Sequence, residues 1–191
     1  MYDKEEVIEL MYPIHKTFPD SEGVPFHFVY RDTKSPQNEL PDHWHDRSEI
    51  VFVQSGEGIF FINGMFLSMR PGDVFLLPAD TIHRAIPDSV NPVTSSVLFI
   101  SPSLLAEPIL GDTFTLSMVF DRARTTQTYR IPLDEPLRCT VQAVIHNIQA
   151  EFDHKQSGYY FSVKLHIQRL LLDLYRRGSL SPDYETATNG S

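Results

Sequence analysis

The sequence has 191 residues, which is enough for one domain of ordinary size and too few for two full domains. Hydrophobic residues make up 41% of it and charged residues 21%, a composition that excludes a disordered chain and a fibrous one. The net charge of −9 argues against direct binding to nucleic-acid phosphates, and no apolar run approaches the ~18 residues of a membrane span, so we expect a cytoplasmic protein without a membrane partner.

The first 42 residues are predicted to form an arm followed by one strand. Five prolines exclude a long helix here, and the aromatic and β-branched run at 26–31 predicts a strand. Short strands separated by turn signals follow, and the strongest of these signals is the hairpin pair Asn63-Gly64. The close spacing predicts an antiparallel sandwich or barrel. The expected strands are 49–54, 58–62, 65–69, 74–77, 82–86 and 95–100.

Farther along the chain the apolar period changes from two residues to about 3.6, which predicts helices. Asp134 is the expected N-cap of the first helix, and the Ser-Gly pair at 157–158 ends it. A second helix should end at Gly178, and 179–191 should form a polar linker or a frayed end. Cys139, the only cysteine, is expected to be a buried thiol because it lies in an apolar-periodic segment.

The apolar residues of the second helix form a stripe wide enough to contact more than the barrel. Because the rest of the chain covers only one side of a helix, we predict that this stripe forms a homodimer interface. Leu165, Leu172 and Tyr175 add apolar surface on a neighbouring face, and which face meets the barrel stays open. The predicted interface residues are Val163, Ile167, Leu170, Leu171 and Leu174.

Three histidines and one glutamate carry the clearest chemical pattern. His43 and His45 are one residue apart on a predicted extended segment, so their side chains point to one face and can reach one ion. Glu49 begins the next strand, and His83 comes from a separate strand. Three imidazoles and one carboxylate suit zinc, nickel, manganese, iron or copper. The same groups also suit a metal-free pocket in which the imidazoles hydrogen-bond each other or the hydroxyls of a ligand.

The spacing of these residues resembles the two sequence motifs of the cupin superfamily. The pattern H-x-H-x3-E-x6-G begins at His43, and G-x5-P-x4-H ends at His83. The resemblance implies a mostly β fold, the cupin double-stranded β-helix or jelly-roll barrel. Three positions depart from the motifs: Asp80 replaces a usual glycine, Pro87 replaces a usual asparagine, and Gln37 stands where a glycine often precedes the first histidine.

A wider segment resembles the N-terminal sensor domain of AraC-family transcription regulators. The similarity rests on HWHDRSEIVFVQSGEGIFFINGMFLSMRPGDVFLLPADTIHRA and on YYFSVKLHIQRLLLDLYRR, and it extends over most of 25–177. It implies a cupin barrel with an N-terminal arm (1–132), a C-terminal two-helix hairpin for dimerisation (133–178) and a linker (179–191). In that family the barrel binds a small effector, often a sugar, and the arm can fold over it. The resemblance implies a non-enzymatic sensor that contacts DNA only through a C-terminal domain absent from this chain.

Two further residues and one further function stay open. His27 and Arg31 have even spacing on the first predicted strand, so both should share a face, where they line the pocket mouth or form plain surface. By the same alternation Trp44 should point away from the pocket. The alternative function is a small metal-dependent cupin enzyme, an oxygenase or a sugar isomerase. A helical hairpin with a polar tail favours the sensor, because a self-contained enzyme rarely needs both.

Overall fold

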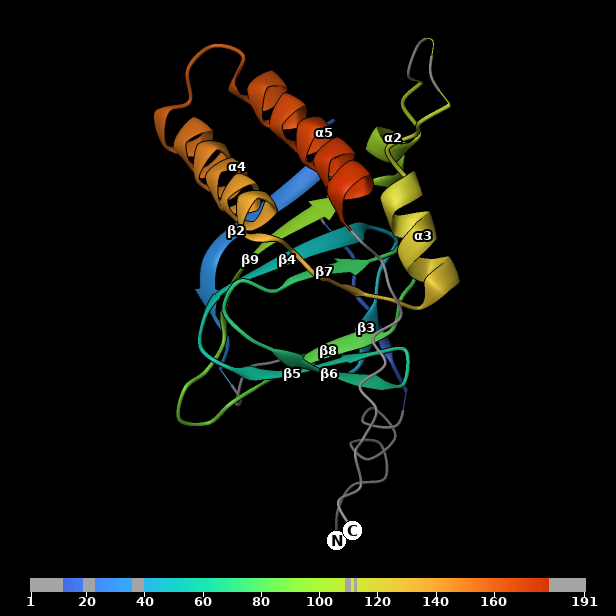
Figure 1. Ribbon diagram of the computed structural model, residues 1–191, viewed down its shortest axis with the longest axis vertical. Helices are drawn as coiled ribbons and strands as arrows, with labels where there is room; N and C mark the ends of the chain where they lie inside the picture. Colours follow the sequence, from blue (N-terminus) through green and yellow to red (C-terminus); the bar gives the residue numbers. More distant parts are fainter. Residues whose placement is uncertain (1–11, 19–22, 36–39, 109–110, 112, 179–191) are drawn as a thin grey trace, which may run out of the picture.

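The computed structural model describes residues 12–18, 23–35, 40–108, 111 and 113–178. Within them two five-stranded sheets face each other as a barrel, and helices cover the outside of one sheet (Figure 1). The first sheet contains, in order of pairing, β1 (Ile14–His15), β3 (His43–Trp44), β8 (His83–Pro87), β5 (Gly58–Ile62) and β6 (Met65–Met69). The second contains β10 (Arg130–Ile131), β7 (Val74–Leu77), β4 (Ser48–Ser55), β9 (Thr94–Ile100) and β2 (Phe26–Thr33).

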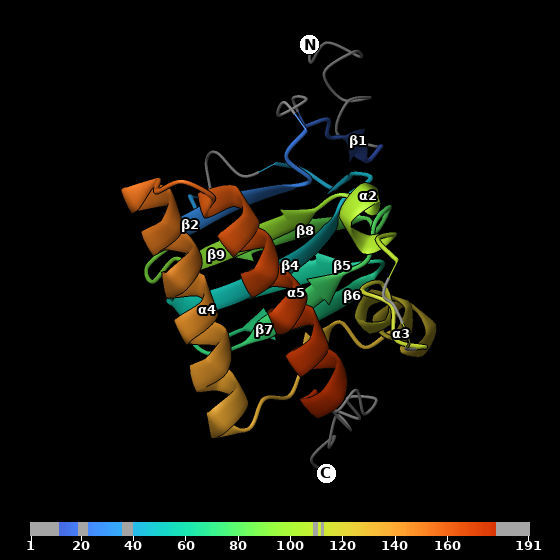
Figure 2. The same cartoon turned by 90° about the horizontal axis from the view of Figure 1, so that it is seen from above.

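The predicted C-terminal helix pair is present and lies across the outer face of the second sheet (Figure 2). Asp134 caps its first helix, as predicted, by accepting a hydrogen bond from the backbone N–H of Leu137 at 2.8 Å. The predicted linker, 179–191, lies outside the described residues. No helix within the described ranges has the length and apolar character needed to cross a membrane. The described helices are α2 (Pro102–Leu105), α3 (Met118–Thr126), α4 (Glu135–His154) and α5 (Tyr159–Arg177).

The expected β-rich fold with a closing helical hairpin is confirmed, and most strand limits agree to within one or two residues. The hairpin at Asn63-Gly64 joins β5 to β6, and both residues have positive φ, the conformation that such a turn requires. The sequence analysis did not identify β1, β3, β10, α2 or α3. The three strands have two residues each and exist only through pairing with distant segments, so no local pattern marks them.

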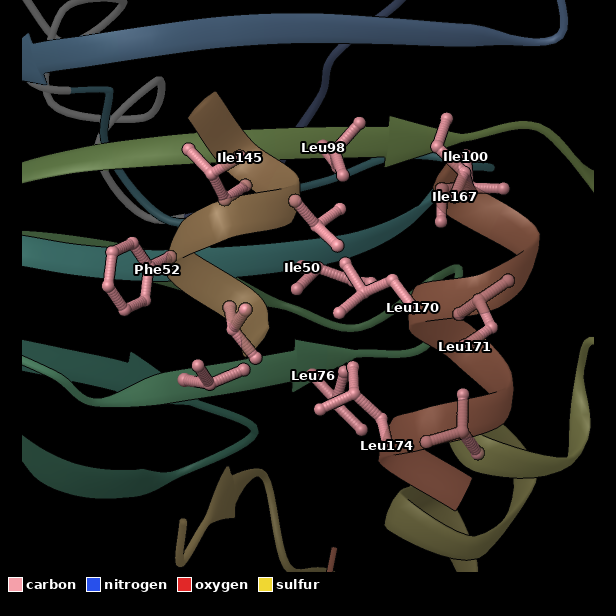
Figure 3. Close-up of a cluster of buried hydrophobic side chains, with 14 of the residues drawn as sticks. Ile50, Phe52, Leu76, Leu98, Ile100, Ile145, Ile167, Leu170, Leu171 and Leu174 are labelled. Carbon is pink, nitrogen blue, oxygen red and sulfur yellow. The ribbon is translucent and has the colours of Figure 1, made fainter. Parts of the chain in front are cut away.

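The apolar residues divide into two cores on opposite sides of the second sheet. Val51 and Val53 of β4 point into the barrel, whereas Ile50 and Phe52 point toward the helices, as strand alternation predicts. Figure 3 shows the helix-side core, where side chains of α4 and α5 meet those of the sheet. The helical pair and the sheet therefore share one continuous core.

The predicted dimer stripe of α5 requires a correction, because its side chains are buried within the chain. All five are at most 1% exposed and pack in the helix-side core (Figure 3). The sheet and α4 together consume the full width of the stripe, which is why its width does not imply a second partner. The buried residues are Val163, Ile167, Leu170, Leu171 and Leu174.

Cys139 is exposed, so the expectation of a buried thiol is wrong. The buried face of α4 includes Leu137 and Val141, and Cys139 lies between them in the sequence. Two residues along a helix correspond to a rotation of about 200°, which carries the thiol to the opposite side. Its Sγ atom lies 3.7 Å from a carboxylate oxygen of Glu135 on that outer face.

Candidate functional site

The four residues predicted as a site, His43, His45, Glu49 and His83, come together and are buried. Pairing of β3 with β8 places His43 directly opposite His83, with ring centroids 4.3 Å apart. The ring of His45 lies 5.1 Å from that of His83. One ring nitrogen from each histidine lies within 4.8 Å of the others, which is close enough for a single ion to contact all three.

Each of the three imidazoles is oriented by a backbone carbonyl. The Nδ1 atoms donate to these carbonyl oxygens at 2.8–2.9 Å. A carbonyl can only accept, so Nδ1 carries the hydrogen and Nε2 of the neutral ring keeps its lone pair. This is the second-shell arrangement that orients metal-binding histidines. The donor and acceptor pairs are His43 with Pro41, His45 with Arg47 and His83 with Thr81.

Glu49 lies between two of these nitrogens. Its Oε2 atom is 3.2 Å from Nε2 of His45 and 3.3 Å from Nε2 of His83. Burial by itself raises the pKa of Glu49, but hydrogen bonds from the two imidazoles and their positive charge lower it well below its usual range. An ionised carboxylate facing two lone pairs requires a shared positive charge, either a proton on the imidazoles or a metal ion.

His43 differs from the other two imidazoles in its electrostatic environment. Burial, and then the nearby charge of His83, lower the pKa of His43 to about 4, although its contact with Pro41 and the charge of Glu49 oppose the shift. The ring is therefore neutral near pH 7. A neutral imidazole whose Nδ1 is already hydrogen-bonded offers Nε2 to an ion or to a ligand hydroxyl.

The two motif segments are joined directly by the backbone. The N–H of Asp80 donates to the carbonyl oxygen of His45 at 2.8 Å. Asp80 has a φ of 60°, the left-handed conformation that glycine adopts most easily and aspartate tolerates better than most residues. The departure from the motif at this position therefore keeps the turn that brings His83 to the first motif.

The N-terminal arm covers the site. Strand β1 pairs in parallel with β3, and the N–H of Lys16 donates to the carbonyl of Trp44 at 2.9 Å. The arm then places the ring of Phe18 edge-on against His45, at 5.2 Å between centroids. Trp44 stacks on His15 of the arm at 4.0 Å, away from the three histidines, as its alternation predicts.

The two open candidates on β2 have different positions. His27 is exposed, yet its ring lies 5.9 Å from that of Phe99 and 6.2 Å from that of Phe18, beside the cover of the site. Arg31 lies in a β-bulge between Val29 and Asp32 and has a φ of 48°. A bulge breaks the alternation of side chains, so the prediction that Arg31 shares the face of His27 loses its basis.

Sequence reasoning did not identify the aromatic and cationic surroundings of the histidines. Phe99 of β9 is paired with Glu49, and its ring lies 5.5 Å from that of His45. Lys16 and Arg47 lie over the aromatic rings of the cover. No spacing rule links these residues, because they come from an irregular arm, a turn and a distant strand.

Residues 25–171 match the family described as the AraC-like ligand binding domain. The chain belongs to this family. The expected resemblance is thereby confirmed, and the AraC-like domain accounts for the barrel together with most of the helical pair.

Solved structures agree with this assignment at the level of the fold. Apo ToxT from Vibrio cholerae is similar with a TM-score of 0.51 and 10% identity, over 84% of this chain and 60% of ToxT. The AraC-like transcriptional activator CuxR has a TM-score of 0.42 and 12% identity, over 66% of this chain and 42% of CuxR. A cupin protein from Bacteroides fragilis has a TM-score of 0.34 and 19% identity, over 47% of this chain and 73% of that protein.

The donor set of this AraC-like domain fits a divalent transition metal. Its three imidazoles are oriented through Nδ1, and its one carboxylate is ionised and buried among them. Imidazole and carboxylate together suit zinc, nickel, manganese and iron, and four protein ligands leave room for ligand atoms on the larger coordination shells.

Proposed function

We propose that this domain senses a small-molecule effector for a transcription regulator and catalyses no reaction itself. The observation that carries the proposal is the buried cluster of three imidazoles and one carboxylate beneath the arm of an AraC-like ligand-binding domain. An effector seated there touches both barrel and arm, so its affinity depends on where the arm lies. That difference in affinity is what shifts an equilibrium between two arrangements of a protein.

A carbohydrate is the proposed effector class. Carboxylate and imidazole groups accept and donate hydrogen bonds to hydroxyls, and the aromatic rings of Phe18 and Phe99 offer apolar faces beside them. The test is a melting-temperature screen against sugars and related polyols. A bound effector should stabilise the protein by about 2.7 kcal/mol at a hundredfold excess over Kd, and His45→Ala or Glu49→Ala should abolish the shift. A shift that survives both substitutions would contradict this site.

The same four residues are proposed to hold one metal ion, zinc, nickel, manganese or iron. When bound, the ion would supply a positive charge that neutralises Glu49 and a Lewis-acidic contact for an effector oxygen. Metal analysis of protein purified without added metal tests this directly. Less than a tenth of an equivalent of every transition metal, before and after incubation with each ion, would contradict it.

A metal-dependent enzyme is the second candidate function. The orientation of the three imidazoles toward one carboxylate favours it, because the same ligand set serves oxygenases and isomerases. The two functions are distinguished by incubating the metal-loaded protein with sugars, with and without oxygen, and following substrate loss. Turnover that disappears in His83→Gln would establish the enzyme, whereas binding without turnover supports the sensor.

Dimerisation and DNA contact complete the proposal. We infer that homodimers form through the outer face of α5, where Phe161 and Leu165 are 64% and 49% exposed. DNA contact is assigned to a separate domain, because the net charge of −9 disfavours binding by this one. The proposed location is the cytoplasm, where such a regulator meets DNA.

A further inference from the structure

Two cationic side chains converge on the aromatic cover of the histidine site. The ammonium of Lys16 lies 5.1 Å from the ring centroid of Phe18 and 4.9 Å from that of Phe99. The guanidinium of Arg47 lies 4.6 Å from the ring centroid of Phe18. Both rings contact His45, so the two charges belong to the surroundings of the site.

The electrostatic effect of this pair reaches the imidazoles around it. Burial, and after it the charges of Arg47 and Lys16, lower the pKa of His27. The charge of Lys16 also acts on His43 in the same direction. The entrance to the site is therefore electropositive, although the whole chain carries a net charge of −9.

One nitrogen of Arg47 has an unmet hydrogen-bonding requirement. Its Nη1 atom is buried and has no hydrogen-bond partner among the described residues. Buried polar groups in native proteins are normally paired, and an unpaired nitrogen of a charged group is especially unfavourable. Phe18 covers the flat face of the guanidinium, which leaves its nitrogens to interact in the plane of the group.

The described carboxylates nearby are engaged elsewhere or face solvent. Glu49 is held between two imidazoles, and Asp42 lies 3.4 Å from Arg84. Asp46 precedes Arg47 directly, but its side chain is exposed. The ion pairs found within the described ranges do not include Arg47. An acceptor from outside this part of the chain is therefore the natural partner for its buried nitrogen.

We propose that the effector carries a carboxylate, as a sugar acid does, and that Arg47 binds it while Lys16 adds long-range attraction. The inference rests on the proposed sensing function and narrows its ligand class. A guanidinium presents parallel N–H groups that match the two oxygens of a carboxylate, which a neutral sugar lacks. The hydroxyls of the same molecule would face the imidazoles and Glu49, and its acid group would lie beneath the arm.

The test compares matched acids and neutral compounds on the full chain. Gluconate is paired with sorbitol, galacturonate with galactose and glycerate with glycerol, and melting temperature and calorimetric Kd are measured for each. The acid of at least one pair should bind tenfold or more tightly than its neutral partner, and Arg47→Gln should weaken the acid roughly tenfold to a hundredfold. Arg47→Lys should restore only part of the affinity, because it keeps the charge and loses the fork.

Arg70→Gln is the control, since it removes an equal charge at an exposed turn outside the site. The backbone carbonyl that holds His45 is unchanged by any substitution at Arg47, so circular dichroism and melting without ligand should match the wild type. Neutral compounds that bind as tightly as the acids overturn the carboxylate proposal but leave effector sensing intact. Acid binding that Arg47→Gln does not weaken overturns the role of Arg47. Failure of both acids and neutral compounds to bind overturns the proposal together with the carbohydrate-sensing function.

Discussion

The ring of Phe18 stands edge-on against the ring of His45, with their centroids 5.2 Å apart. A residue of the arm thus closes a site whose other members belong to the barrel. Phe18→Ala should leave the barrel folded and open this cover, so that a bound metal or effector dissociates several times faster. Stopped-flow removal of cobalt by a chelator measures the rate. Phe66→Ala is the matched control, because Phe66 is 65% exposed on β6; equal rates in both variants would contradict the covering role.

Removal of one imidazole should abolish tight metal binding. His83→Gln keeps a polar side chain but withdraws a ligand that faces Glu49 at 3.3 Å. The loss expected from a missing first ligand is at least the 10- to 100-fold typical of second-shell changes. Calorimetric titration with zinc and nickel measures it. His154→Gln removes an exposed histidine of α4 and should bind as the wild type does; a similar loss in both variants would indicate non-specific binding.

The metal-free protein should lose stability between pH 6.5 and about 4 because of His43. The unfolded chain takes up a proton at His43 near pH 6.5, whereas the folded chain resists it until about pH 4. The free energy of unfolding should therefore fall as the pH falls through this window, by up to about 3 kcal/mol from this residue. Urea unfolding of protein treated with a chelator measures the slope. His43→Gln should show a correspondingly shallower slope, and identical slopes would rule out the contribution.

Gly56 should tolerate no side chain. Its φ is 75°, and a Cβ atom there would collide with the carbonyl oxygen of Pro92. Gly56→Ala should lower the free energy of unfolding by about 3 kcal/mol. Gly64→Ala has the same kind of φ, 87°, but meets open space, and should cost only about 1 kcal/mol. The difference between the two variants in urea unfolding isolates the collision; equal losses would show that backbone conformation alone decides.

The two faces of α5 should respond differently to truncation. Leu174 is 1% exposed in the helix-side core, so Leu174→Ala should cost about 2–5 kcal/mol of unfolding free energy. Leu165 is 49% exposed, so Leu165→Ala should change the stability of the monomer by less than about 0.5 kcal/mol. If the outer face forms the dimer, Leu165→Ala should also lower the sedimentation coefficient at tens of micromolar. A wild-type protein that sediments as a monomer would contradict the dimer.

The barrel and its histidines could be predicted because both depend on local regularities. Strand alternation placed Val51 and Ile50 on opposite sides of one sheet, and the fixed motif spacing identified His43 and His83 before their pairing was known. The closing helices were equally clear from the 3.6-residue period and from the cap at Asp134.

The remaining features depend on tertiary placement, which local patterns do not encode. Phe18 contacts the site although it lies in a proline-rich arm without periodicity. The interior-facing stripe on α5 has the same pattern that a dimer interface would have, so the sequence could not separate the two uses of Leu170. The bulge at Arg31 ended an alternation that composition gave no reason to doubt. Cys139 was misjudged because membership of an amphipathic helix was given more weight than angular position around it.

The two-sided burial of β4 has a mechanical consequence. Glu49 faces the histidines, and the next residue, Ile50, lies beneath Leu170 of α5 (Figure 3). One peptide unit therefore separates the ligating carboxylate from the seat of the last helix. A change in what Glu49 binds would pass through covalent backbone into the tilt of α5, with no relay of side chains between them. The signal such a domain sends would be an angle of a helix, set by the chemistry one residue away.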